Sequence, residues 1–259
     1  MSNWTRGALV LGSLLLASAA PLAAQDFEWR GSVDRGDEVE IRGINGGIDV
    51  VASSGSQVHV TATKKEGPKG SADDVTIEVV EHSGGVVICA MYPNKPGKRE
   101  NRCSPGDNHM NNHDNDTSVE FRVEMPAGID LAVGTVNGEV DVRGVDGDVQ
   151  ASTVNGDVEV EASGNVEAST VNGSIEARLG EDLKSDLSFA TVNGGITVEL
   201  PAGANANVSA STVNGGLESD FPLTIQGRFS NRRMRGQIGD GGYDLELSTV
   251  NGGIRLRRS

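Results

Sequence analysis

The chain has 259 residues and carries 37 Asp and Glu against 22 Lys and Arg, a net charge of −15. A surface of this sign disfavours nucleic acid and anionic membranes as partners. Aromatic residues make up only 3% of the chain and glycine is abundant, with 35 residues. That composition would suit a disordered chain, but the regular spacing of valine and isoleucine argues for a folded one.

The first 24 residues have the order of a secretory signal peptide. Arg6 gives a positive start, residues 8–20 form an apolar run, and residues 21–24 are proline and small or apolar residues. The alternative is a membrane anchor, but a run of about 13 residues is too short for a hydrocarbon core about 30 Å thick. We therefore expect residues 1–24 to be a signal peptide. The rest of the chain should be exported, to the periplasm, the cell surface or the medium, without spanning the membrane.

Residues 25–92 alternate apolar and polar side chains in several short segments, as half-buried strands do. The alternation is clearest at residues 38–42, 47–50, 58–62 and 75–79. A stack of repeats needs an atypical unit to cover its last rung. We therefore expect residues 25–92 to form an N-terminal β cap, with Phe27 and Trp29 closing that end.

Residues 93–118 are polar and show no apolar period, which is typical of an exposed loop insertion. Cys103 lies in this loop and Cys89 lies just before it. Two cysteines in an oxidising compartment favour one disulfide over two free thiols. A disulfide closing a loop of this length is worth about 3 kcal/mol.

The loop also carries four side chains of metal-binding type, namely His109, His113, Asp114 and Asp116. Imidazole combined with carboxylate suits zinc or nickel. Because no predicted strand or helix fixes their geometry, we assign no metal site to them, and the sequence leaves metal binding there open.

Residues 119–259 contain six copies of Thr-Val-Asn-Gly, beginning at Thr135, Thr153, Thr170, Thr191, Thr212 and Thr249. The intervals are 18, 17, 21, 21 and 37 residues. We attribute the doubled last interval to an irregular stretch, residues 222–242, that interrupts the repeat once. Ile44-Asn45-Gly46-Gly47 looks like an earlier relative of the motif. A fixed period of this kind predicts a repeat architecture.

Between the copies, apolar and acidic residues alternate, so that Val158 and Val160 fall on one face and Glu159 and Glu161 on the other. The alternation slips at each Thr-Val-Asn-Gly, so the chain must bend there, and Asn and Gly tolerate the positive φ of a bend. Short strands between equivalent corners predict an all-β, single-domain β-solenoid with rungs about 4.8 Å apart. A β-sandwich would show hairpin turns and varied strand lengths, and a propeller blade needs about 40 residues.

In such a stack the corner asparagines lie above one another. Their side-chain amides can then bond from rung to rung, as in other stacked β structures. The sequence therefore predicts a structural ladder of Asn137, Asn155, Asn172, Asn193, Asn214 and Asn251.

Carboxylates are plentiful in the repeats and could serve two types of site. Glu139, Asp148 and Asp157 follow corner glycines and form a partial row that suits loose calcium binding, although such rows are more often solvated faces. Polysaccharide lyases and hydrolases need a pair of carboxylates at a fixed separation, or a strong base. The carboxylates here repeat evenly, so we assign no catalytic residue, no cofactor and no metal site.

Several segments together resemble a family of bacterial exported proteins of unknown function that are usually labelled putative adhesins. They are residues 119–128 leading into Thr135, Cys89 with the later Cys103, residues 236–242, and the closing motif at residues 249–254. The resemblance covers nearly the whole chain after residue 24. It implies a β-solenoid with a role in the cell envelope, and it implies no catalytic residues.

The predicted function is therefore an exported, non-catalytic envelope protein that acts as an adhesin-like binding or scaffolding module. The alternative is a carbohydrate-active enzyme, a polysaccharide lyase or hydrolase, on the same scaffold. Residues 119–220 carry 18 acids and 4 bases, whereas residues 221–259 carry 3 acids and 7 arginines. The expected partners are an envelope polymer or protein, and the basic C-terminal end also suits self-association with the acidic side of a second copy.

Overall fold

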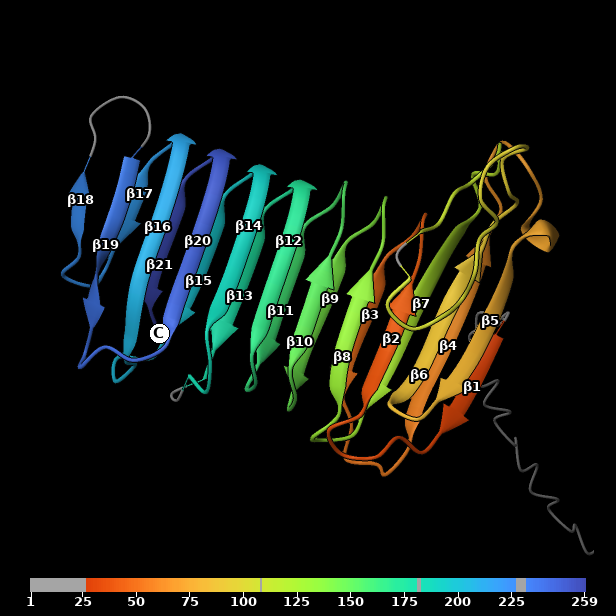
Figure 1. The fold of residues 1–259 in the computed structure, drawn as a ribbon, viewed down its shortest axis with the longest axis horizontal. Coiled ribbons are helices and arrows are strands. Elements are labelled where there is room, and N and C mark those ends of the chain that lie inside the picture. The colour runs from red at the N-terminus through yellow and green to blue at the C-terminus, as the bar shows by residue number, and fades with distance from the viewer. Residues whose placement is uncertain (1–26, 108, 181–182, 227–231) are drawn as a thin grey trace, which may run out of the picture.

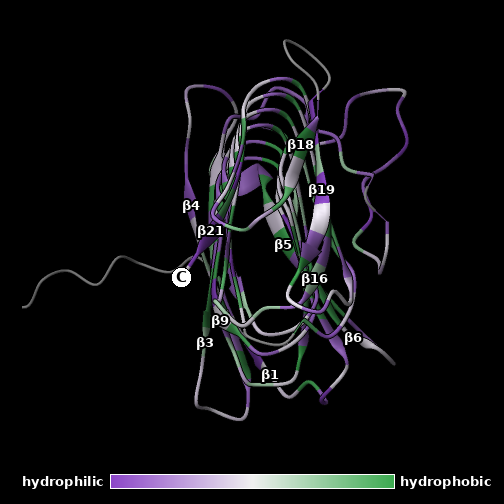
Figure 2. Ribbon diagram, turned by 90° about the vertical axis from the view of Figure 1, so that its left-hand side faces the viewer, coloured by the Kyte–Doolittle hydropathy of each residue, from purple (hydrophilic) through white to green (hydrophobic). Residues whose placement is uncertain are grey.

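The computed structural model describes residues 27–107, 109–180, 183–226 and 232–259, and almost every element in it is a β-strand. The predicted signal peptide, residues 1–24, lies outside the described residues. The strands follow one another in a long row (Figure 1). Seen along that row, they form two walls joined by bends of the chain (Figure 2). The predicted all-β solenoid is thereby confirmed.

The first wall, sheet A, contains ten strands of the described chain. In spatial order they are β1 (Phe27–Gly31), β4 (Val58–Lys65), β7 (Ser118–Met125), β3 (Ile48–Ala52), β9 (Val140–Val145), β11 (Val158–Ala162), β13 (Ile175–Leu179), β15 (Ile196–Leu200), β21 (Ile254–Arg258) and β17 (Leu217–Ser219).

The second wall, sheet B, contains eleven strands of the described chain. In spatial order they are β18 (Thr224–Gln226), β19 (Arg232–Ile238), β16 (Ala206–Asn214), β20 (Asp244–Asn251), β14 (Leu187–Asn193), β12 (Val166–Asn172), β10 (Val149–Ser152), β8 (Asp130–Gly134), β2 (Glu38–Arg42), β6 (Gly85–Met91) and β5 (Thr76–His82). A single 3₁₀ turn, η1 (Ala72–Asp74), precedes β5.

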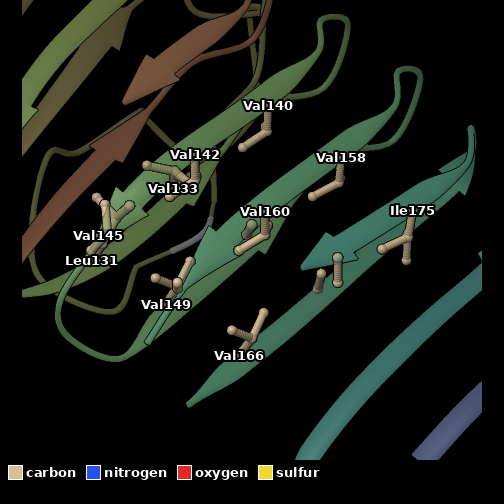
Figure 3. Close-up of a cluster of buried hydrophobic side chains, with 14 of the residues drawn as sticks. Leu131, Val133, Val140, Val142, Val145, Val149, Val158, Val160, Val166 and Ile175 are labelled. Carbon is tan, nitrogen blue, oxygen red and sulfur yellow. The ribbon is translucent and has the colours of Figure 1, made fainter. Parts of the chain in front are cut away.

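Rungs of the stack pair parallel and in register, so equivalent residues form columns along the solenoid. Val158 of β11 pairs with Val140 of β9 on one side and with Ile175 of β13 on the other. All three side chains are buried, and Figure 3 shows side chains of this kind gathered in the space between the two sheets. This column continues through Ile48, Ile196, Ile254 and Leu217. The small β-branched residues of the repeat therefore form one narrow core.

The order of the last rungs differs from the order in the sequence. β20 lies between β14 and β16, and β21 lies between β15 and β17. Residues 222–242 interrupt the repeat, as expected, but the rung that follows them in the sequence is not the next one in space. After β17 the chain forms β18 and β19, which cover the outer edge of β16, and it then returns to insert one more rung inside the stack.

Both ends of the stack contain antiparallel pairs, although at the C-terminal end sheet A finishes with the parallel pair of β17 and β21. At the N-terminal end β1 pairs with β4 and β5 pairs with β6, and Phe27 and Trp29 pack against the core there while remaining partly exposed. Residues 25–92 also supply β2 and β3, which lie inside the stack. At the C-terminal end Arg258 lies 5.0 Å from the centroid of the Phe221 ring. The described chain contains no helix with the length and apolar character needed to span a bilayer.

Candidate functional site

The threonine of each corner motif faces the core and bonds to the neighbouring rung. Thr170 is 5% exposed, and its hydroxyl donates to the backbone carbonyl of Gly156 over 2.9 Å. The other five motif threonines make the same bond to the equivalent corner glycine, over 2.8–3.0 Å. The hydroxyl therefore satisfies a carbonyl that would otherwise be unbonded at the bend.

The corner asparagines form a continuous ladder of side-chain hydrogen bonds. Asn172 Nδ2 donates to Asn155 Oδ1 over 2.8 Å, and the remaining steps are 2.8–2.9 Å long. In spatial order the ladder runs Asn45, Asn137, Asn155, Asn172, Asn193, Asn251 and Asn214. The six predicted members are exposed, so their bonds lie at the surface of the solenoid.

The corner positions require glycine mainly because the neighbouring rung leaves no room for a Cβ, and less because of their backbone φ. A Cβ on Gly194 would lie 1.8 Å from the carbonyl oxygen of Gly173 in the next rung. Of the corner glycines described, Gly46 has a left-handed φ of 112°, while Gly156, at 159°, is close to extended. The expectation that each bend uses a positive φ is therefore wrong for most copies, because stacking of rungs already excludes a side chain.

A hollow with a volume of about 1130 Å³ lies on the outer face of sheet A. We call it the sheet A hollow. β3, β4, β7 and β9 supply its floor, and the corner segments at residues 45–47 and 137–139 form one side. Its polar lining residues are Asn45, Asp49, Thr61, Thr63, Asp116, Ser118, Glu120, Arg122, Asn137, Glu139 and Asp141.

Ion pairs fix several of these side chains. Arg122 of β7 pairs with Asp49 of β3, and Arg143 bridges Asp49 and Asp141 from the neighbouring strand. Glu120 Oε2 accepts the backbone N–H of Gly47 over 2.7 Å. The hollow therefore presents carboxylate, amide, hydroxyl and guanidinium groups whose positions are set by four strands and a corner.

A smaller hollow of about 220 Å³ lies on the outer face of sheet B, beside the polar loop. The loop is joined to β6 by a disulfide between Cys89 and Cys103. It covers an ion pair between Glu40 and Arg42 of β2, which are only 7% and 5% exposed. Arg42 Nη1 also donates to the backbone carbonyl of Ser104, over 2.9 Å, so the pair anchors the loop to the sheet.

The four candidate metal ligands of the loop do not converge. His113 Nδ1 lies 3.8 Å from Asp114 Oδ2, and both side chains are well exposed. Asp116 lines the sheet A hollow, and the His109 backbone N–H donates to Asp107 Oδ1. Across the described residues, no three His, Cys, Asp or Glu side chains are placed to share a metal ion.

The three acidic residues whose spacing suits loose calcium binding are divided between two kinds of corner. Glu139 and Asp157 follow the Thr-Val-Asn-Gly bends that lead into sheet A, whereas Asp148 precedes β10 of sheet B. Asp157 Oδ1 accepts the backbone N–H of Ser174, and Asp148 Oδ1 accepts that of Asn165. The half-repeat alternates between the sheets, so the three carboxylates do not form one row, and Asp148 and Asp157 instead bond to the next rung.

Two parts of the surface were missed from the sequence. Asn45 is a seventh ladder member, and the partial motif Ile44-Asn45-Gly46-Gly47 is the sequence feature that could have predicted it. No sequence feature predicts the sheet A hollow, because it forms where β4 and β7 pair antiparallel beside β3. The basic C-terminal end carries exposed arginines on both faces, with Arg233 and Arg235 on β19 and Arg257 on β21.

Two facing sheets, stacked corners and in-register parallel rungs define a β-solenoid whose hollows lie on its outer faces. The chain belongs to the Toastrack DUF4097 family, which matches residues 68–257. Among solved structures it is similar to a putative cell adhesion protein from Clostridium sporogenes ATCC 15579. That similarity has 12% identity and a TM-score of 0.45, and it covers 90% of this chain and 99% of the other.

A second similar structure is a putative adhesin from Bacteroides fragilis NCTC 9343. It is 11% identical, with a TM-score of 0.30, and the match covers 90% of this chain and 96% of the other. The comparison with curated proteins gave no match.

Proposed function

We propose that this chain is an exported, non-catalytic module of the cell envelope that binds a hydroxyl-rich polymer or a protein, in the manner of an adhesin. The sheet A hollow is the observation that carries the proposal. It is open, and it offers both donors and acceptors at fixed positions, which is what recognition of many hydroxyl groups requires.

The rigidity of the hollow supports a binding role. Asp49 contacts two arginines and Glu120 is bonded to a backbone N–H, so these side chains are held before a ligand arrives. A ligand then meets a surface that loses little conformational entropy on binding. The in-register rungs repeat similar outer faces beyond the hollow, which suits a partner that is itself a repeating polymer.

Export is supported by two features of the chain. Residues 1–24 have the composition of a signal peptide. Cys89 and Cys103 form a disulfide, and disulfides persist in oxidising compartments such as the periplasm and the cell exterior. Both features favour a location outside the cytoplasm.

A glycan array probed with the purified exported chain tests the binding role. We expect binding to a limited set of polymers, and we expect Arg122→Ala to weaken it at least several-fold, because Arg122 lies in the hollow and orients Asp49. The matched control is Arg178→Ala. Arg178 is also ion-paired on the outer face of sheet A, to Glu159 over 2.7 Å, but it lies outside the hollow.

The same polymers, incubated with the protein, test the non-catalytic part of the proposal. We expect their size distribution to stay unchanged over long incubation. Release of oligosaccharides would instead show the alternative, a carbohydrate-active enzyme. If Arg122→Ala and Arg178→Ala weaken binding equally, the sheet A hollow is not the binding site.

Self-association through the basic C-terminal end is part of the proposal. The exposed Arg233 and Arg235 on β19 give this end a charge opposite to that of the acidic middle rungs. We expect any self-association to weaken as salt rises, since exposed charges are screened. Sedimentation of the protein and of an Arg233→Ser, Arg235→Ser variant at low and high salt tests this. Identical behaviour of the two proteins would contradict it.

A further inference from the structure

The asparagine ladder is closed at one end and open at the other. At the N-terminal end, Asn45 Nδ2 donates to the carbonyls of Asn115 and Thr117, over 3.3 and 3.5 Å. At the C-terminal end, Asn214 Nδ2 donates to Asn251 Oδ1 over 2.9 Å. Within the described chain, nothing donates to Asn214 Oδ1, because no further rung of this kind follows.

The glycine after each asparagine shows the same asymmetry. Gly173 N–H donates to the backbone carbonyl of Asn193 in the next rung over 3.1 Å, and Gly252 N–H donates to that of Asn214 over 3.0 Å. The corresponding bonds at Gly46, Gly138, Gly156 and Gly194 are 2.8–3.0 Å long. Gly215 N–H, after Asn214, has no acceptor among the described residues.

Asparagine followed by glycine can react with its own backbone. The glycine amide nitrogen attacks the side-chain carbonyl carbon of the asparagine, and this requires a nitrogen that is not held in a hydrogen bond. Glycine favours the reaction because it has no Cβ to obstruct the approach. Six of the seven Asn-Gly pairs in the stack are therefore protected by the ladder and by the backbone bond of the glycine.

We propose that Asn214-Gly215 is a site of spontaneous deamidation in the folded protein. A bond forms between Gly215 N and Asn214 Cγ, and the bond from Cγ to Nδ2 breaks. Ammonia leaves with the proton that Gly215 N loses, and a cyclic imide remains. Water then opens either carbonyl of the imide and gives aspartate or isoaspartate at position 214. Water is the one co-reactant.

The product changes the C-terminal end of the solenoid. The amide that donates to Asn251 is replaced by a carboxylate, so the last step of the ladder is lost and a negative charge appears at the end that carries the arginines. Isoaspartate also adds one carbon to the backbone at the end of β16, two residues before β17 begins. β17 pairs with β21 through three residues only, so we expect the extra atom to disturb the register of this short pairing.

Peptide mapping of the folded protein tests the proposal. The protein is incubated at slightly alkaline pH and then cleaved after glutamate. Glu199 and Glu218 place Asn214 in a different peptide from Asn193 and Asn251. We expect conversion of amide to acid at Asn214 to be roughly tenfold faster than at Asn251. At Asn251 the hydrogen bond of the Gly252 N–H and the hydrogen bond accepted by Asn251 Oδ1 must first break, and Asn214-Gly215 makes neither of these two bonds within the described chain.

The same incubation in denaturant is the control for intrinsic reactivity. All seven Asn-Gly pairs should convert at similar rates there, because no ladder protects any of them. In the folded protein, conversion spread evenly over the seven pairs, or conversion at Asn214 no faster than at Asn251, would overturn the proposal. An Asn214→Gln variant should show no conversion at this position and should leave the rates at the other six unchanged.

Discussion

Asn251 donates its side-chain amide to Asn193 Oδ1 over 2.8 Å, although 58 residues separate the two in the sequence. Asn214 is closer to Asn193 in the sequence, but it lies one rung further out in the stack. Its side-chain amide donates to Asn251 Oδ1. The ladder therefore records the spatial order of the rungs, which differs from the order in which the chain forms them.

The buried threonine hydroxyl should matter more to stability than its small size suggests. Replacing Thr170 with Val keeps the shape but removes the donor to the Gly156 carbonyl. We expect a loss of about 1–3 kcal/mol in the free energy of unfolding, because a buried acceptor is left unsatisfied. Denaturant unfolding measures it. Thr170→Ser keeps the hydroxyl and should cost clearly less, and equal losses would show that this bond is not what stabilises the corner.

A methyl group at a corner glycine should separate two rungs. A Cβ on Gly194 would lie 1.8 Å from the Gly173 carbonyl oxygen, so the backbone of one rung has to move. We expect Gly194→Ala to lower the unfolding free energy by roughly 3 kcal/mol or more, the range of severe overpacking. Gly216→Ala is the matched control, since nothing lies within 4 Å of its Cβ. A Gly194→Ala protein as stable as Gly216→Ala would contradict close stacking of the corners.

The buried Glu40–Arg42 pair should be much more sensitive than the exposed pairs of sheet A. Arg42→Met leaves Glu40 buried without its partner, at an expected cost of about 3–5 kcal/mol. Arg143→Met breaks an exposed pair and should cost much less, because solvent screens the attraction between exposed charges. Thermal unfolding of the two variants measures the difference. We also expect Arg42→Met to expose the polar loop to protease, and a loop that stays protected would show that Arg42 is not needed to hold it.

Glu38 should make stability depend on pH. Burial raises the pKa of its carboxyl above the ordinary value of 4.5, and the charges of Glu40 and Asp130 raise it further. The folded state therefore binds this proton more tightly than the unfolded state, so the contribution is favourable at low pH and is lost as pH rises through the raised pKa. We expect Glu38→Gln to melt at a higher temperature than the parent at neutral pH. Below pH 4.5 the two should melt alike, and a difference independent of pH would show that ionisation of Glu38 is not its cause.

The fold was predictable because its physical cause repeats in the sequence. The alternation of apolar and acidic residues around Val158 and Val160 predicts which side chains face inward. The break in that alternation at each Thr-Val-Asn-Gly predicts where the chain bends. The order of the last rungs was not predictable in this way. The copies at Thr212 and Thr249 are identical, so no local residue tells which one follows Asn193 in space.

The candidate site was less predictable than the fold. The sheet A hollow depends on Thr61 and Thr63 of β4 lying beside β7, an antiparallel pairing across the whole polar loop. No motif marks these residues, because hydroxyl and carboxylate side chains on an outer face look like any solvated surface. The sequence likewise could not show whether Glu139, Asp148 and Asp157 form one row, since equal spacing from a glycine does not show which of two alternating corners a residue occupies.

Cross-linking of engineered cysteines tests the stacked corners most directly. Stacked corner positions of adjacent rungs lie about 4.8 Å apart, within the range that a disulfide can bridge. We predict that Asn193→Cys with Asn251→Cys forms a disulfide readily, and that Asn193→Cys with Asn214→Cys does not, since a rung lies between those two. Cross-linking of the second pair and not the first would contradict the inserted rung, and failure of both would contradict the stacked corners.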